Sequence, residues 1–183
     1  MTHAELAILS LIGEQPRHGY EIEQVIEERG MREWTEVGFS SIYYLLKKLE
    51  RDALVESSLE EAERGPARKV YTLTPAGREA LQVGLLEALS TPHHCYPPIQ
   101  LGLSNLPGLP PAQVLAALGE YHATLAKRRA AVEAKWNAQR PLPSFVDAVF
   151  DYSLTMIQAE LAWVERLIEQ LSVPHESQQN LSR

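Results

Sequence analysis

One segment of this 183-residue chain has two faces of opposite chemistry, and it constrains the fold more than any other feature. Residues 39–53 read FSSIYYLLKKLERDA, and the apolar side chains recur at the spacing of one helical face. These apolar positions are Ile42, Leu46, Leu49 and Ala53. About 200° round a helix of 3.6 residues per turn lies a polar stripe of Ser40, Tyr44, Lys47 and Arg51, with Lys48 beside it. The pattern predicts a helix that buries one face and leaves a cationic face open to water.

Two short helices are expected before this segment. The first is predicted over residues 4–12, where apolar side chains recur three and four apart, and Gly13 and Pro16 should end it. The second begins after Gly19, places its glutamates on the solvated side and ends at Gly30.

A hairpin and a further helix are expected after it. Residues 53–59 and 68–73 are short runs typical of strands, and a Gly-Pro pair within a charged stretch separates them. Thr74 is suited to cap the next helix, with Pro75 at its first position. The order helix, helix, helix, hairpin, helix is that of a winged helix-turn-helix domain.

The second half of the chain has a different character. Residues 90–111 contain six prolines and predict a linker or an irregular connection. Two long helical patterns follow, over about 112–136 and 144–171, and the short turn between them predicts an antiparallel pair. Their apolar stripes are wider than one hairpin can bury, which favours a partner chain. We therefore predict a mainly α-helical protein, with a DNA-binding domain over 1–90 and a helical dimerisation and possible effector domain over 91–183.

Charge and composition limit the classes of function. The chain has 17 Lys and Arg against 24 Asp and Glu, and its first 90 residues carry 10 against 16, a net charge of −6. A uniformly basic nucleic-acid binder is excluded, so any anion-binding surface must be a local patch. A single cysteine favours a reducing cytosol, and we see neither a signal peptide nor a membrane span. We expect a cytoplasmic protein without a membrane partner.

Several stretches together resemble the PadR family of bacterial transcriptional regulators. They are AELAILSLIGEQPRHGYEIEQVI, SSIYYLLKKLERDALVESS and GPARKVYTLTPAGREAL, within about residues 4–90. The resemblance implies a homodimer that binds a roughly palindromic operator on double-stranded DNA, usually as a repressor, and is often released by a small-molecule effector. Tyr44 departs from the usual pattern of the family, so its partner on DNA is not implied.

The predicted DNA-binding residues lie on the 39–53 helix and around the hairpin tip. They are Ser40, Ser41, Tyr44, Lys47, Lys48, Arg51, Arg64, Arg68 and Lys69. The helix would enter the major groove, and the hairpin cations would reach the minor groove or the backbone. The alternatives are an ordinary solvated helix face and a plain hairpin loop, and the acidic residues at the tip partly support the second.

Aromatic residues are interpreted mainly as packing residues. Three tyrosines are expected to be buried or half-buried rather than in contact with DNA, namely Tyr20, Tyr43 and Tyr71. Three tryptophans are expected to pack, with an effector pocket as the alternative, namely Trp34, Trp136 and Trp163.

Two rival functions remain open. A winged-helix module that binds protein instead of DNA would agree with the acidic first half. An enzyme is disfavoured, because the sequence has no nucleophile-base-acid set, phosphate loop or paired metal-ligand motif. The residues His93, His94 and Cys95 could sense a metal or redox state, but adjacent histidines cannot easily bind one ion. We therefore predict no catalytic residues, no metal site and no cofactor.

Overall fold

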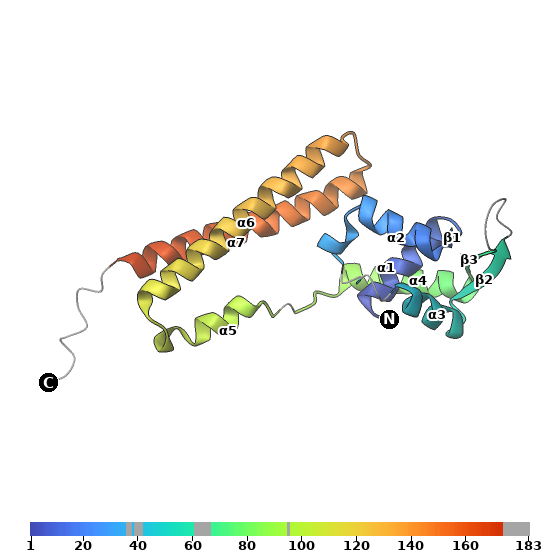
Figure 1. The fold of residues 1–183 in the computed structure, drawn as a ribbon, viewed down its shortest axis with the longest axis horizontal. Helices are drawn as coiled ribbons and strands as arrows, with labels where there is room; N and C mark the ends of the chain where they lie inside the picture. The colour runs from blue at the N-terminus through green and yellow to red at the C-terminus, as the bar shows by residue number, and fades with distance from the viewer. Residues whose placement is uncertain (36–37, 39–41, 61–66, 95, 174–183) are drawn as a thin grey trace. The chain divides into compact units, whose positions relative to one another are not determined.

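The structure of the protein is a computed structural model, which describes residues 1–35, 38, 42–60, 67–94 and 96–173. The chain divides into two compact units, Met1–His94 and Cys95–Arg183 (Figure 1).

The first unit has the element order that the sequence predicts. Its elements are α1 (His3–Glu14), β1 (Arg17–His18), α2 (Gly19–Glu28), the 3-10 helix η1 (Met31–Glu33), α3 (Ile42–Arg51), β2 (Val55–Glu60), β3 (Arg68–Leu73) and α4 (Pro75–Ser90). The three strands form one antiparallel sheet in the order β1-β3-β2. We refer to β2 and β3 together as the wing. The two-residue β1 was not predicted, because it is too short to show an alternating pattern.

The first helix begins and ends differently from its prediction. Thr2 caps it, since its Oγ1 accepts the Glu5 N–H at 3.2 Å while the Glu5 carboxylate accepts the Thr2 N–H at 2.8 Å. The predicted stop at Gly13 and Pro16 is confirmed in part, because α1 continues through Gly13 to Glu14 and ends before Pro16. A Cβ at Gly13 would lie 2.9 Å from Leu81 Cδ2, so this glycine allows α4 to approach α1 closely.

The core of the first unit forms where α1, α2, α3 and the root of the wing meet. Its members with no exposed surface are Ile8, Leu9, Ile22, Ile26 and Leu46. Ile42 and Leu49 are buried as predicted, and Leu45 joins them. The sequence thus identified most of the buried face of α3 correctly.

Ala53 is an exception, because it is exposed and lies beyond the end of α3. Its φ of 57° is left-handed, and the Leu54 N–H donates to the Leu49 carbonyl at 2.9 Å. The Ala53 N–H donates to the Glu50 carbonyl at 3.0 Å, which completes a Schellman motif with alanine where glycine is usual. The predicted helical face therefore extended to Ala53, two residues beyond Arg51, where α3 ends.

The start of α4 joins the wing to the end of α3. Thr74 Oγ1 accepts the Gly77 N–H at 2.9 Å and donates to the Ala53 carbonyl at 2.8 Å, so the predicted cap is confirmed. A Cβ at Gly77 would lie 1.9 Å from the Leu54 carbonyl oxygen. Only glycine allows this approach between α4 and the root of the wing.

The second unit is a helical hairpin preceded by short helical turns. Its elements are α5 (Pro98–Ser104), the 3-10 helix η2 (Leu106–Gly108), α6 (Pro111–Gln139) and α7 (Ser144–Ser172). Figure 1 shows α6 and α7 side by side, which confirms the two predicted long helices. The proline-rich stretch is more ordered than a linker, since α5 and η2 lie within it and prolines occupy first helical positions. None of the helices described here is both long and apolar enough to cross a membrane.

Gly77→Ala should destabilise the first unit by about 1–3 kcal/mol, because the new methyl group overlaps a backbone oxygen that cannot move aside easily. Gly84→Ala, on the same helix, is the matched control. Its Cβ would meet only the side-chain ends of Met1 (2.7 Å) and Leu6 (2.9 Å), which can rotate away. We expect this variant to stay within about 1 kcal/mol of the parent, because alanine favours a helix interior. Thermal unfolding of the full chain measures both, and equal stability of the two variants would contradict the packing argument.

Candidate nucleic-acid interface

One face of α3 projects polar and cationic side chains from the first unit. Tyr44 is 67% exposed, Lys47 is exposed, and the Arg51 side chain is 71% exposed. We call these three residues the α3 ridge. Arg51 Nε donates to Asp52 Oδ1 at 3.1 Å, while Lys47 makes no ion pair within the described part of the chain. Ser40 and Ser41, predicted to continue the ridge, lie outside the described residues.

Lys48 differs from the ridge cations, because it forms an ion pair with Glu5 of α1. The Glu5 side chain is only 6% exposed, whereas that of Lys48 is 31% exposed. Burial by itself raises the pKa of Glu5. Hydrogen bonds from Lys48 and the Thr2 amide lower the pKa and together outweigh burial, so the pKa of Glu5 lies below its ordinary value. The same hydrogen bond raises the pKa of Lys48. The charge at position 48 is therefore paired with a carboxylate of α1, although the Lys48 side chain is itself partly exposed.

The wing presents two described cations. Arg68 and Lys69 are exposed on β3, and Arg64 lies outside the described residues. Lys69 Nζ donates to Glu50 Oε2 at 2.7 Å and lies 5.4 Å from the centre of the Tyr71 ring. Glu50 also accepts a hydrogen bond of 2.5 Å from Ser57 Oγ. Hydrogen bonds from Lys69 and Ser57 lower the pKa of Glu50 below its ordinary value.

The three tyrosines expected to be buried or half-buried behave differently from one another. Tyr71 is 6% exposed, as predicted, whereas Tyr20 and Tyr43 are 61% and 53% exposed, so the prediction for those two is wrong. The α2 side chains in the core are Ile22 and Ile26, which lie on the other side of the helix from Tyr20. A Cβ at Gly19 would lie 2.7 Å from Tyr43 Cε1, so Tyr43 packs over the start of α2 instead of entering the core.

The tryptophans do not form one common feature. Trp136 packs within the second unit, where its ring stacks on Phe150 with centroids 6.0 Å apart. Its Nε1 donates to Asp147 Oδ1 at 2.7 Å, and the Arg140 guanidinium lies 4.4 Å from the ring centroid. Trp163 is half-buried in the same unit, but Trp34 in the first unit is 52% exposed, so packing does not account for it.

The histidine and cysteine cluster gains no support as a metal site. His93 and His94 are exposed, the His93 ring packs edge-on against His3 at 5.0 Å, and Cys95 lies outside the described residues. No group of three or more potential metal ligands occurs in the described ranges.

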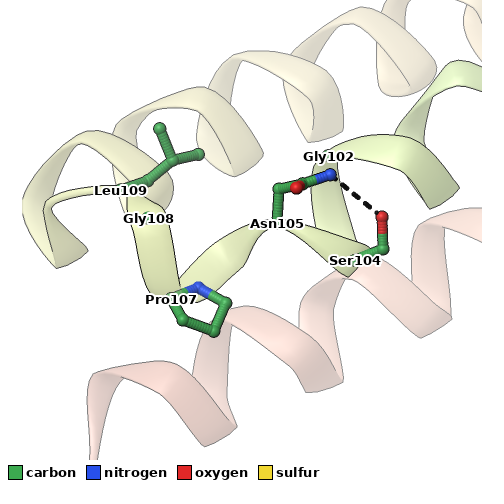
Figure 2. Close-up of a pocket in the computed structure, with 6 residues that line it drawn as sticks. All are labelled: Gly102, Ser104, Asn105, Pro107, Gly108 and Leu109. Atoms are coloured by element: carbon green, nitrogen blue, oxygen red, sulfur yellow. Dashed lines mark hydrogen bonds between the residues drawn. The ribbon is translucent and has the colours of Figure 1, made fainter.

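A shallow hollow of about 380 Å³ lies at the junction of α5 and η2 (Figure 2). Its lining residues are Gly102, Ser104, Asn105, Pro107, Gly108 and Leu109. Asn105 Nδ2 donates to Ser104 Oγ at 3.1 Å and to the Leu101 carbonyl at 2.8 Å, so the polar lining bonds within itself. This lining has no charged side chain, and its one hydroxyl, Ser104 Oγ, accepts a hydrogen bond from Asn105.

The sequence of the first unit matches a known protein family over most of its length. Residues 8–83 match the model of a family described as the transcriptional regulator PadR-like family. "Uncharacterized protein X" of Lysinibacillus sphaericus is 32% identical over 79 residues, which cover 43% of this chain and 72% of that protein.

Solved structures extend the similarity to most of the chain. The structure of Bacillus subtilis PadR in complex with operator DNA is 18% identical with a TM-score of 0.75, over 91% of this chain and 98% of that chain. The structure of Bacillus subtilis PadR in complex with p-coumaric acid is 19% identical with a TM-score of 0.75, over 92% and 98% of the two chains. At these identities the likeness shows the fold, and the predicted winged helix-turn-helix is confirmed.

Proposed function

This chain belongs to the PadR-like family of transcriptional regulators, and we propose on that premise that it binds operator DNA as a homodimer and acts as a repressor. Residues 1–90 would bind the DNA, and residues 91–183 would hold the dimer together. The expectation of a regulator rather than an enzyme follows from the same family membership.

The α3 ridge is the observation that carries this proposal. Tyr44, Lys47 and Arg51 project from the helix opposite its buried face, and an α-helix fits the major groove of B-DNA. Cations placed there neutralise phosphates, while a tyrosine can bond to a phosphate or a base edge. Ser40 and Ser41 remain proposed contacts at the N-terminal approach to this helix.

The wing would contact the DNA beside the major groove. Arg68 is exposed on β3 at the end nearest the tip, and Arg64 remains a proposed contact within the tip. Cationic wings reach the minor groove or the backbone next to the recognition helix. Lys48 and Lys69 belong to the same predicted surface, and each is paired with a carboxylate of the first unit.

An exposed apolar stripe on α7 supports the homodimer. Its members are spaced four, three and four residues apart and are between 41% and 73% exposed, namely Phe145, Val149, Tyr152 and Met156. The residues of α7 that pack against α6 lie on another side of the helix and include Ile157 and Leu161. A two-fold dimer would place two α3 helices about 34 Å apart, in successive major grooves of a palindromic operator.

We also propose a small-molecule effector that releases the DNA. Bacillus subtilis PadR, whose fold this chain shares, has been solved with p-coumaric acid bound. An effector would act by preferring a dimer geometry that does not match the operator half-sites.

Lys47→Ala and Arg51→Ala should each weaken retention of a DNA fragment taken from upstream of this protein's own gene. Each lost phosphate contact should lower the slope of log affinity against log salt by about 0.9, measured between roughly 50 and 200 mM. Lys127→Ala on α6, also an exposed cation, is the control and should leave both quantities unchanged. Unchanged retention at low salt after reversing the charge of both ridge cations would favour the protein-binding alternative.

Tyr152→Glu and Met156→Glu should each convert the dimer to a monomer, because a carboxylate in an apolar interface is costly to desolvate. Sedimentation equilibrium should give twice the 20.5 kDa chain mass for the parent and once that mass for the variants. Ala123→Glu, at an exposed position of α6, should stay dimeric. A parent protein with the mass of one chain would refute the dimer.

p-Coumaric acid should release the parent protein from the same DNA fragment in a saturable manner. Effectors typically change affinity by about 5–150-fold, so the retention curve should shift by an amount in that range. Sodium acetate at matched ionic strength and pH controls for charge effects. Retention that does not change over the titration would indicate that this compound is not the effector.

A further inference from the structure

We propose that Lys48 and Lys69 are positioning residues that orient α3 and the wing through ion pairs with Glu5 and Glu50, rather than contacts to DNA. This inference rests on the proposed DNA-binding function. It assigns two of the predicted cations to a role that the sequence did not indicate.

The two ion pairs lie on opposite flanks of the α3 ridge. Lys48 lies about 100° round the helix from Lys47 in one direction, and Glu50 lies about 60° from Lys47 in the other. Lys48 reaches α1 through Glu5, whereas Glu50 reaches the wing through Lys69. One pair on each side resists rotation of α3 about its own axis, and that rotation decides where the ridge points.

The pair with Glu5 ties Lys48 to the fold. The Glu5 side chain is nearly buried and accepts a backbone hydrogen bond from Thr2 in addition to the bond from Lys48. A carboxylate in this position is costly to leave without its cation. Moving Lys48 away from Glu5 to a phosphate would leave the Glu5 charge unpaired, so the ion pair with Glu5 is favoured.

The pair with Glu50 ties the wing to α3. The Glu50 carboxylate accepts hydrogen bonds from Ser57 Oγ of β2 and from Lys69 Nζ of β3. One side chain of α3 therefore contacts both strands of the wing. The Tyr71 ring lies close to the same ammonium group. Lys69 therefore positions the wing relative to α3. Of the two described wing cations, Arg68 is then the one that would contact the DNA backbone.

The test is a pair of double variants, in which the carboxylate and its lysine are neutralised together. Lys48→Met alone leaves Glu5 charged, buried and unpaired. With Glu5→Gln added, a neutral side chain can still accept the Thr2 N–H, and no unpaired charge remains. Lys69→Met and Glu50→Gln form the second set, and Lys47→Met is the matched lysine variant on the ridge.

We expect each single lysine variant at 48 and 69 to weaken retention of the upstream DNA fragment by about tenfold, because residues that share an ion pair are energetically coupled. The double variants should return to within about threefold of the parent, with the salt slope of the parent. Lys47→Met should instead lower the slope by about 0.9. Double variants that stay weak with a reduced slope would show that these lysines contact phosphate, and single variants that bind like the parent would show that they position nothing.

The free energy of unfolding provides a second test, which still applies if a single variant folds too poorly for the DNA-binding measurement. The lowered pKa of Glu5 means that its contribution to stability is present above its ordinary value of 4.5 and is lost as pH falls through the lower folded value. In Lys48→Met the buried Glu5 charge has no cation, and protonation of Glu5 in acid removes that unpaired charge, so the stability difference from the double variant should be large at pH 7 and shrink in acid. No such difference at pH 7 would overturn the inference for Glu5. A folded parent that retains no DNA even at low salt would instead overturn the proposed function, which is a separate result.

Discussion

The burial of one face of α3 is the constraint on which the rest of the first unit depends. Ile42, Leu46 and Leu49 are each at most 1% exposed, and burying a side chain of this size contributes about 1.5–3 kcal/mol. Side chains on a helix have fixed angular positions, so this burial turns the opposite residues outward. The α3 ridge therefore needs no interaction of its own to stay exposed. The core keeps the ridge on the outside of the unit, and the proposed ion pairs of Lys48 and Lys69 would then set the direction in which it points.

An acidic first unit and a cationic ridge are compatible because screening confines the effect of each charge to its own surroundings. Among the residues that the structure describes, several carboxylates of this unit form ion pairs with lysine or arginine, namely Glu5, Glu14, Glu27, Glu50 and Asp52. A paired charge has little effect beyond the screening length of about 8–10 Å, so what a ligand meets is the local surface. Net charge thus excluded a uniformly basic binder correctly, but it said little about the patch formed by α3 and the wing.

The sequence predicted what depends on local periodicity and missed what depends on distant neighbours. The element order, the Thr74 cap and most of the buried face of α3 were correct, because each is written within about a dozen residues. Glu5 and Lys48 are 43 positions apart, so no local pattern could show that one holds the other. The exposure of Tyr43 depends on Gly19 in the same way, through a contact formed only in the folded chain. The sequence identified the residues of the candidate site. Only the structure shows which of its cations are paired with carboxylates of the fold.

The two units expose surfaces of different chemistry, and this difference argues for different partners. The α3 ridge offers two cations and a phenol, which suit a phosphate backbone and gain little from another protein surface of the same charge. The α7 stripe offers aromatic and aliphatic side chains, which suit a second apolar surface and gain nothing from phosphate. A regulator that reads a palindrome needs both kinds of surface, because the duplex fixes the distance between half-sites and only a protein interface can match it. In the proposed dimer, anything that changes the α7 contact therefore acts on DNA affinity through the spacing of the two ridges, without touching either of them.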